Sequence, residues 1–267
     1  MRRNLMSLPR IISLFGLALL FILIIHSCIN SPPRYQLPAG PTIEKAVLQI
    51  PAALPPGQKT PQQIYKEARY LAEIHVIGKR NDSDEEVSGI GSGFLIKFNN
   101  KYLVLTAAHV IRDSRFTVKE ITVYLKGKPD GYSAEVDKVS ADNLDCATLK
   151  FGDPNFKFTD NLAMLHLQKD FEVGDDVYSL GSPMGIGYAF GRGILMNLDF
   201  GQRKIPGLDW RSVIVHNATI APGSSGGPLV DQYGRVIGMN VALHPTYQNY
   251  QLATFITDIL DWLATQY

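Results

Sequence analysis

From residue 71 onward, hydrophobic residues come in short runs of β-branched and aromatic side chains, separated by clusters of turn residues. Short runs at intervals of roughly 8–15 residues are typical of β-barrels and β-sandwiches rather than of a parallel sheet with crossover helices. The runs form two series on either side of a turn-rich stretch, residues 152–162. The predicted strands are 71–77, 93–98, 102–106, 121–125, 132–139 and 146–151, then 176–180, 193–198, 213–220, 229–231, 235–240 and 250–253. We therefore predict an all-β fold of two six-stranded antiparallel barrels, one at about 71–152 and one at about 163–267.

Two short helices flank the predicted strands. Thr60 is followed by a proline and then, three residues on, by Gln63, a pattern that predicts a capped helix start and a helix to about Tyr70. Near the C-terminus, hydrophobic residues between 255 and 263 recur at helical spacing on one stripe. This stripe predicts a terminal helix that is capped by Thr254 or Thr257 and packs on the second series of strands.

The first residues have the pattern of a targeting segment. Three arginines precede an apolar run at residues 11–25, which is shorter than the roughly 20 residues needed to span a membrane and is typical of a secretory signal. The tetrapeptide that ends at Cys28 resembles a bacterial lipobox, which implies cleavage after residue 27 and a lipid on Cys28. A plain signal anchor, with Cys28 an ordinary residue, is the alternative. Residues 28–59 are proline-rich and predict an extended tether, so we expect residues 60–267 to form an exported domain in the cell envelope.

Charge and cysteine content narrow the function classes. The chain has 26 basic and 25 acidic residues. Loss of residues 1–27 with their three arginines leaves 23 basic and 25 acidic residues, a net charge of −2. A near-neutral balance excludes the strongly basic face expected of a nucleic-acid-binding protein. The chain has two cysteines, and a lipid on Cys28 would leave Cys146 without an internal disulfide partner. No Cys/His pairs occur at ligand spacing, so we expect neither a metal nor another cofactor.

Three segments carry candidate chemistry. His109 ends a predicted strand, Asp145 directly precedes another, and Ser225 lies in the glycine-rich turn 223–228 between two more. A serine hydroxyl needs a base within hydrogen-bond reach, and the base needs a carboxylate to fix its tautomer. These residues therefore predict a nucleophile, Ser225, with His109 as general base and Asp145 as the orienting acid. Glycines around the serine allow the backbone N–H groups of Gly223 and Ser225 to point at one oxyanion.

Neighbouring residues offer alternatives at two of these positions. Asp142 lies three residues before Asp145, but only Asp145 is followed at once by an apolar strand. Ser224 adjoins Ser225, but only Ser225 is followed by two glycines. The turn also fits the Gly-x-Ser-x-Gly elbow of α/β-hydrolases, which requires a helix after the serine and a histidine late in the chain. A proline and a predicted strand follow instead, so we set that fold aside.

The three segments, in this order, resemble the chymotrypsin fold of serine peptidases, and more closely its bacterial Deg/HtrA branch. The flanking stretches 91–96, 173–175, 180–185 and 234–240 are similar to that branch as well, so the resemblance covers about residues 60–267. It implies a serine endopeptidase that acts on polypeptides. In digestive relatives of this fold, activation depends on an ion pair between a new N-terminus and an aspartate just before the nucleophile, and this chain has Ser224 at that position. We therefore expect the active site to be ordered by the enzyme's own loops, with residues 185–193 as the loop that switches activity.

The resemblance also bounds specificity and assembly. It implies that the pocket for the residue on the acyl side of the cut is formed by Thr219, Ala221, Pro222, Met239, Asn240 and Val241. Because none of these is acidic, we predict a preference for small or medium aliphatic residues. We expect no PDZ domain in the residues after Ser225, and the branch implies that the segment with Tyr65 and Tyr70 can mediate homotrimers. The rival hypothesis is a latent, non-catalytic module that keeps these residues and binds unfolded chains as a chaperone.

Overall fold

The computed structural model describes residues 57–140, 144–198, 213–243 and 249–267. The predicted signal segment, Cys28 and the tether as far as residue 56 lie outside the described residues. Within those four ranges, no helix combines the length and the apolar character needed to cross a membrane.

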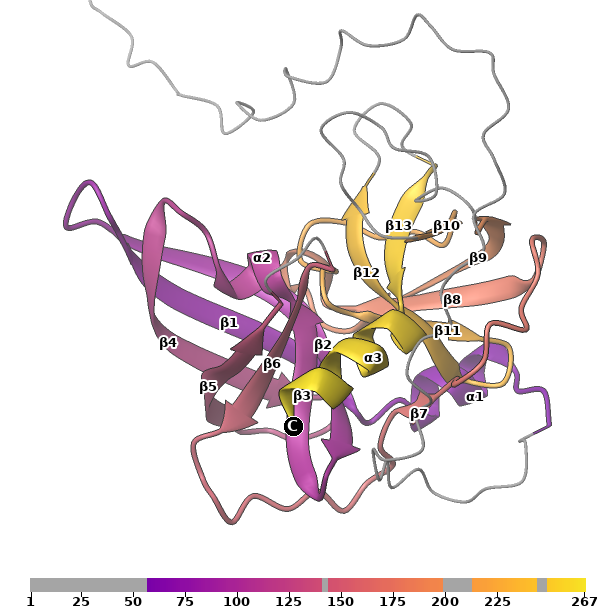
Figure 1. Cartoon of the computed structure of the whole chain (residues 1–267), viewed down its shortest axis with the longest axis horizontal. Coiled ribbons are helices and arrows are strands. Elements are labelled where there is room, and N and C mark those ends of the chain that lie inside the picture. Colours follow the sequence, from indigo (N-terminus) through magenta and orange to yellow (C-terminus); the bar gives the residue numbers. More distant parts are fainter. Residues whose placement is uncertain (1–56, 141–143, 199–212, 244–248) are drawn as a thin grey trace, which may run out of the picture. The chain divides into compact units, whose positions relative to one another are not determined.

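Six antiparallel strands form the N-terminal barrel, in the order β1-β2-β3-β6-β5-β4, and β4 closes it by pairing with β1 (Figure 1). The turn between β2 and β3 places Asn99 and Asn100 at φ 44° and 65°, a left-handed conformation that asparagine tolerates and that tight hairpins require. The strands are β1 (Leu71–Arg80), β2 (Glu86–Phe98), β3 (Lys101–Ala107), β4 (Phe116–Leu125), β5 (Gly131–Val139) and β6 (Cys146–Phe151).

The C-terminal barrel closes because β11 pairs with both β8 and β12, giving the ring β11-β8-β9-β10-β13-β12. A further short strand, β7 (Met164–Leu165), adds to β12 in parallel and was not predicted. The ring strands are β8 (Asp176–Gly181), β9 (Ala189–Asn197), β10 (Val213–His216), β11 (Pro228–Asp231), β12 (Arg235–Leu243) and β13 (Gln251–Phe255). The predicted all-β fold of two six-stranded barrels is confirmed.

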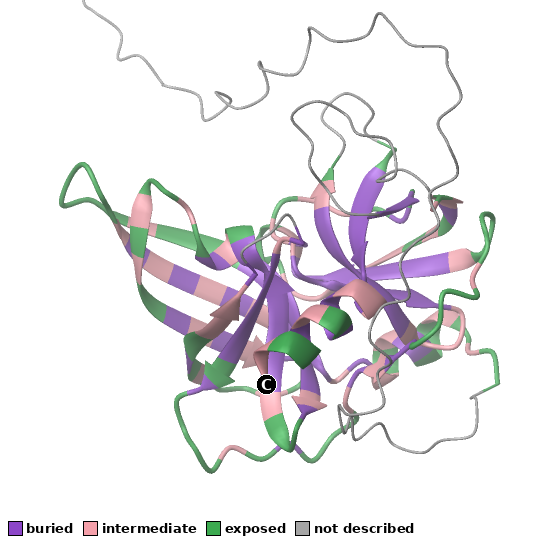
Figure 2. Cartoon of the chain, in the orientation of Figure 1, coloured by how far each residue is buried: buried purple, intermediate pink, exposed green. Residues whose placement is uncertain are grey.

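Burial along β1 and the second half of β4 follows the two-residue period of a strand. Along β1, Ile74 and Val76 are buried while the residues between them are half-exposed, so one face of the strand lines the barrel interior (Figure 2). Strand β9 begins at Ala189, so the predicted switch loop 185–193 is in part a strand and ends at Tyr188.

The helices differ in how far they match expectation. In α1 (Pro61–Glu67), Thr60 and Gln63 form the predicted capping box, but the helix ends three residues before Tyr70, which is buried. In α3 (Ile256–Gln266) the predicted threonine caps are wrong: Phe255 is the N-cap residue and supplies no side-chain hydrogen bond. The Thr254 hydroxyl instead donates to the carbonyl of Leu144.

Helix α3 and the residue after it contact both barrels. It packs on β12 and β13, as predicted for the second series of strands. The residue that follows it, Tyr267, reaches the first barrel, where its ring lies 5.6 Å from that of Phe98 and its hydroxyl bonds to Thr148 at 3.3 Å. The C-terminal residues therefore tie the two barrels together.

Candidate active site

His109 and Asp145 are joined by two hydrogen bonds. His109 lies in the one-turn helix α2 (Ala108–Ile111), which follows β3 directly, and Asp145 immediately precedes β6. Asp145 Oδ2 lies 2.6 Å from Nδ1 of the imidazole, and Oδ1 accepts the backbone N–H of His109 at 2.9 Å. The side chain of His109 is 48% exposed and that of Asp145 is 20% exposed. The carboxylate therefore holds the ring by one nitrogen and leaves Nε2 facing outward.

The backbone of Asp145 explains why one residue can make both bonds. Its φ of 51° lies in the left-handed region, which aspartate visits more readily than most residues. In this conformation its carbonyl also accepts the N–H of Ala108 at 3.0 Å. Asp145 thus takes up the first two N–H groups of α2, a helix that has no side-chain cap of its own. The same residue starts the helix and orients the ring.

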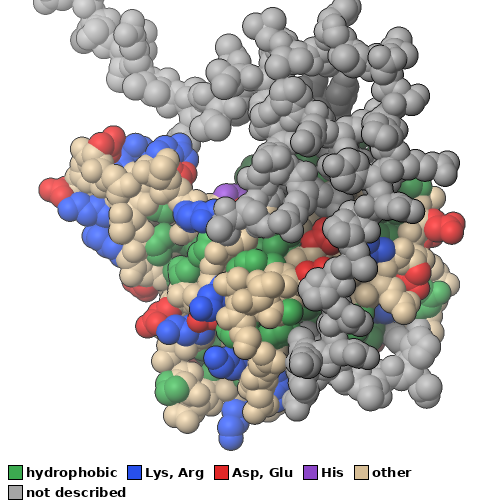
Figure 3. All heavy atoms as spheres, in the orientation of Figure 1, with side chains coloured by type: hydrophobic (Ala, Val, Ile, Leu, Met, Phe, Trp, Pro, Cys, Tyr) green, Lys and Arg blue, Asp and Glu red, His purple; other side chains and the backbone are tan. Residues whose placement is uncertain are grey.

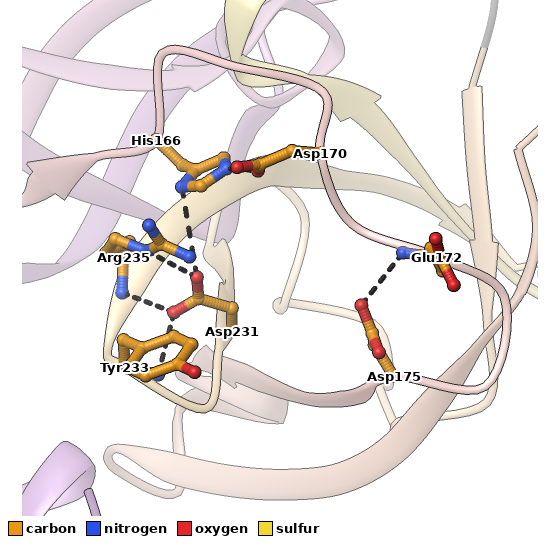
Figure 4. Close-up of polar contacts among 7 residues, drawn as sticks. All are labelled: His166, Asp170, Glu172, Asp175, Asp231, Tyr233 and Arg235. Atoms are coloured by element: carbon orange, nitrogen blue, oxygen red, sulfur yellow. Dashed lines mark hydrogen bonds and ion pairs between the residues drawn. The ribbon is translucent and has the colours of Figure 1, made fainter. Parts of the chain in front are cut away.

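Three other histidines lie among the described residues and have structural partners. His166 is buried, bonds to Asp170 and lies 3.9 Å from Asp231, which also accepts a hydrogen bond from Arg235 at 2.6 Å (Figure 4). His75 bonds to Glu73 on the same strand, and His216 bonds to Asn240 in the second barrel. The described ranges contain no hydrogen bond from any of these three rings to a serine.

Ser225 lies in a tight turn between β10 and β11. Gly223 and Gly226 within this turn have φ of 96° and 88°, conformations that a residue with a Cβ atom resists. A Cβ on Gly226 would also lie 2.2 Å from the carbonyl oxygen of Ser92, so the turn approaches strand β2 as closely as only glycine permits. The backbone of this turn therefore requires glycine at positions 223 and 226 of the Gly-x-Ser-Gly-Gly motif.

Four consecutive carbonyl groups of this turn, those of residues 222–225, accept hydrogen bonds. In order, their donors are the Met184 N–H (2.7 Å), the Ser92 hydroxyl (2.6 Å), the Gly227 N–H (3.0 Å) and the Ser92 N–H (2.8 Å). Met184 belongs to the short 3₁₀ turn η1 (Pro183–Gly185) and has φ 53°, itself left-handed. These four peptide groups are thus held by donors from η1, from β2 and, at Ser224, from Gly227 within the turn.

Two N–H groups remain unused in this arrangement. The Ser224 N–H donates to Ala221 at 2.8 Å and the Gly226 N–H to Asn240 at 2.7 Å, whereas those of Gly223 and Ser225 donate to no acceptor among the described residues. In a trans peptide the N–H points opposite to the carbonyl. Because the carbonyls of residues 222 and 224 are held by Met184 and Gly227, the two unused N–H groups point away from those donors. They are the pair that the sequence predicts for an oxyanion hole.

Strand β2 brings the two halves of the site together. Ser92 binds the turn around Ser225, and the adjacent Gly91 is so close to Val110 that a Cβ there would lie 2.4 Å from its side chain. Val110 follows His109 in α2. The histidine and the serine therefore lie on neighbouring segments at one edge of the first barrel, although no hydrogen bond joins Ser225 Oγ to the imidazole within the described residues.

The predicted pocket residues fall into two groups. Thr219 and Pro222 are exposed and Ala221 is half-buried, whereas Met239, Asn240 and Val241 are buried. The side chain of Asn240 bonds to His216 at 3.1 Å, and its backbone pairs with the turn at Gly226 and Gly227. Asn240 thus supports the turn. The carbonyl of Thr219 accepts a hydrogen bond from Ser179.

On the face shown in Figure 3, Lys, Arg, Asp and Glu side chains are interspersed rather than gathered by sign. Among the residues that the structure describes, no three His, Cys, Asp or Glu side chains form a metal-ligating group. The groups that the structure describes at the site are a hydroxyl, an imidazole, a carboxylate and two backbone amides.

Comparison with known sequences places the chain among peptidases. The trypsin-like peptidase domain family matches residues 91–239, more than half of the sequence. A probable periplasmic serine endoprotease, DegP-like, from Halomonas elongata is 33% identical over 209 residues, which cover 76% of this chain and 40% of that protein. The magnetosome formation protease MamE of Paramagnetospirillum magneticum is 30% identical over 198 residues, or 69% of this chain and 26% of that protein. The chain thus spans less than half the length of these curated relatives.

Solved structures agree on the fold. The serine endoprotease from Yersinia pestis superposes with a TM-score of 0.58 at 22% identity, covering 78% of this chain and 66% of that one. The HtrA-type protease AlgW, crystallised with a tripeptide, gives 0.62 at 23% identity and covers 78% and 63%. The resemblance to Deg/HtrA-like serine peptidases that the motifs indicate is confirmed, and the matched residues lie in both barrels.

Proposed function

Because the chain belongs to the trypsin-like peptidase family, we propose that it is an exported serine endopeptidase that cleaves polypeptides through an acyl-enzyme on Ser225. His109 acts as general base and then as general acid, Asp145 orients it, and the N–H groups of Gly223 and Ser225 stabilise the oxyanion. The names of the DegP-like relatives, which are periplasmic serine endoproteases, support both the activity and the compartment.

The reaction needs only groups described above. Ser225 Oγ bonds to the substrate carbonyl carbon while its proton passes to Nε2 of His109, and the carbonyl oxygen becomes the oxyanion. His109 then gives this proton to the leaving nitrogen as the C–N bond breaks. Water enters, gives a proton to His109 and attacks the acyl group, and Ser225 departs with that proton. Asp145 stays ionised throughout, because its role is to hold the Nδ1–H tautomer and stabilise the imidazolium.

One observation carries the proposal. All four carbonyls of residues 222–225 are held by donors, and the only N–H groups of residues 223–226 left without an acceptor in the described part of the chain are the two that an oxyanion hole requires. Buried or half-buried amides ordinarily have hydrogen-bond partners. In a turn with only a packing role, these two N–H groups would therefore be expected to have acceptors.

A fluorophosphonate probe tests this proposal on the purified exported chain. Covalent modification needs a working base and oxyanion hole, so we expect labelling of the wild type at Ser225 and none of Ser225→Ala. Hydrolysis of an unfolded casein substrate should be lost in the same variant. Ser224→Ala is the matched control, because the neighbouring hydroxyl should not be the labelled atom. Binding of unfolded chains without labelling of the wild type would favour the latent chaperone-like module instead.

We propose a substrate preference from the residues that would form the pocket for the residue on the acyl side of the cut. Thr219, Ala221, Pro222, Met239 and Val241 carry no charge, so a charged side chain entering there would be desolvated without a partner. Small or medium aliphatic residues should therefore dominate cleavage of a peptide library at this position. A profile dominated by lysine and arginine would contradict the pocket assignment.

We further propose that Cys28 is lipidated and anchors the chain to a membrane. The lipobox-like tetrapeptide that ends at this cysteine supports the proposal. Incorporation of an alkyne fatty acid into the wild type, and its loss in Cys28→Ser, would test it. Equal labelling of both proteins, or of neither, would favour a plain signal.

A further inference from the structure

Ser92 lies at the contact between strand β2 and the nucleophile turn and uses every polar group it has. Its N–H donates to the carbonyl of Ser225 at 2.8 Å, and its hydroxyl donates to the carbonyl of Gly223 at 2.6 Å. The same hydroxyl accepts the N–H of Ser182 at 2.8 Å, and its own carbonyl accepts the Thr106 hydroxyl at 2.7 Å. Ser92 is fully buried.

From this geometry we propose that Ser92 is a positioning residue for catalysis: its hydroxyl holds the oxyanion-binding turn in its working conformation. The inference rests on the proposed peptidase function. Ser92 belongs to the first barrel and touches no reacting atom, so its effect must pass through the turn that it holds.

The conformation of Gly223 shows why such an anchor is needed. A glycine restricts its own backbone least of all residues, so the Gly223–Ser224 peptide can rotate unless another group fixes it. Rotation of the peptides around Gly223 would swing its N–H away from the oxyanion position. The Ser224 N–H bond to Ala221 opposes this rotation from within the loop, and two contacts oppose it from other segments, the Met184 N–H on the preceding carbonyl and the Ser92 hydroxyl on the carbonyl of Gly223 itself.

The hydroxyl of Ser92 also joins these two contacts to each other. It accepts the N–H of Ser182, two residues before Met184, so a single oxygen ties η1 and the turn to the first barrel. A Cβ on Gly223 would lie 2.8 Å from both the Ser182 carbonyl oxygen and the Met184 nitrogen, so these segments are in close contact. Loss of the hydroxyl therefore removes its bond to the Gly223 carbonyl and its bond to the Ser182 N–H at once.

Ser92→Ala is the variant that removes only this hydroxyl, and its backbone bond to Ser225 stays. Removal of a direct oxyanion donor costs about 10²–10³-fold in kcat, so loss of an anchor behind it should cost about 10–100-fold. We expect kcat to fall by this factor while KM changes less than about threefold, because the acyl-side pocket is built from other residues. Affinity for a peptide boronate, whose adduct occupies the oxyanion site, should fall in parallel with kcat.

Thr148→Val is the matched control, because it removes a buried hydroxyl of the same barrel that bonds to Lys138 and Tyr267 instead of the turn. It should lower the melting temperature without the fall in kcat. Ser92→Cys, which keeps a side chain of similar size with a weak donor, replaces the alanine variant if that variant does not fold. A fall in kcat no larger than that of Thr148→Val, or a change in KM alone, would overturn the inference.

Amide hydrogen exchange provides a readout that does not depend on activity. In Ser92→Ala we expect faster exchange in residues 221–227 than in the wild type, with the barrel strands unchanged, and in Thr148→Val we expect no change there. If the wild type is not labelled by fluorophosphonate, the proposed function fails, and this measurement still decides whether Ser92 holds the turn. Unchanged exchange in residues 221–227 of the alanine variant would refute it.

Discussion

The two halves of the site are held by different means. His109 depends on one side chain, because Asp145 binds both its ring and its backbone N–H. The turn around Ser225 depends on backbone carbonyls that receive donors from three separate segments, β2, η1 and the turn itself. One half is therefore specified by the chemistry of a single carboxylate and the other by the path of the chain.

This difference predicts two kinds of failure. A replacement that keeps the shape of Asp145 should leave the fold intact and disable the chemistry. A replacement in the turn should disturb the backbone first, and the chemistry only as a result. Substitutions at Asp145 and at Gly223, in order of decreasing effect, separate these outcomes.

Asp145→Asn should show the chemical kind of failure. Asparagine tolerates the left-handed φ of this position, and its oxygen can still accept the His109 N–H. Its amide, however, would face Nδ1 as a donor and favour the wrong tautomer, so kcat should fall about 10⁴-fold with little change in the melting temperature. Steady-state kinetics and thermal unfolding measure both.

A second His–Asp pair provides the control for this change. Asp170→Asn alters the carboxylate beside His166 (Figure 4), which makes no hydrogen bond to residues 221–227 in the described structure, and should leave kcat unchanged. Equal losses in the two variants would show that the effect of Asp145→Asn reflects general destabilisation.

Gly223→Ala should show the structural kind of failure. The new Cβ would lie 2.8 Å from backbone atoms of Ser182 and Met184, at φ 96°, so the turn must move. Displacement of one oxyanion donor should lower kcat by about 10²–10³-fold. Gly234→Ala is matched in strain, since it has φ 77° but its added Cβ would meet neighbouring atoms only at 3.5 Å or more, and should cost about 1–2 kcal/mol of stability without loss of kcat. A normal kcat in Gly223→Ala would exclude its N–H from the oxyanion hole.

The same difference explains what the sequence could and could not predict. His109, Asp145 and Ser225 are recognisable because the reaction requires those residue types at strand ends and in a glycine-rich turn. Ser92 lies in a Gly-Ser-Gly stretch that drew attention only as a flanking similarity, because a side chain bonding to a carbonyl 131 residues away leaves no local pattern.

The fold shows the same limits. Short runs of β-branched and aromatic residues predict the strands well, but the parallel addition of β7 and the lack of a threonine cap on α3 depend on tertiary contacts. In the folded chain the Thr254 hydroxyl donates to the carbonyl of Leu144, a contact that no local sequence pattern reveals. Likewise, Tyr70, expected to be available for trimer contacts, is buried, and the Tyr65 hydroxyl donates to Tyr188 within the same chain.

His216 makes the support of the turn sensitive to acid. Burial lowers its pKa to about 4, against the opposing effect of its hydrogen bond to Asn240, whose backbone pairs with the turn. The unfolded chain therefore binds a proton that the folded chain does not between about pH 6.5 and 4, and stability falls as pH drops through this window. The loss should reach about 3 kcal/mol at most.

Denaturant unfolding between pH 7.5 and 4 measures this loss. Carboxylates elsewhere also contribute to acid sensitivity, so the informative quantity is the difference between the wild type and His216→Gln, which cannot titrate. The variant should show the flatter dependence on pH. Parallel curves would mean that His216 does not set the acid sensitivity of the second barrel.

Thr60→Ala should have the smallest effect and bear on neither half of the site. The Thr60 hydroxyl accepts the Gln63 N–H at 3.3 Å, while the Gln63 side chain accepts the Thr60 N–H at 2.8 Å. Loss of such a cap costs about 1 kcal/mol, which for a domain of this size lowers the melting temperature by about 2–4 °C. Thr60→Ser keeps the cap and should behave as the wild type. Because α1 makes no hydrogen bond to residues 221–227 in the described structure, kcat should stay the same in both variants, and a fall in Thr60→Ala alone would show that the N-terminal helix also helps to hold the turn.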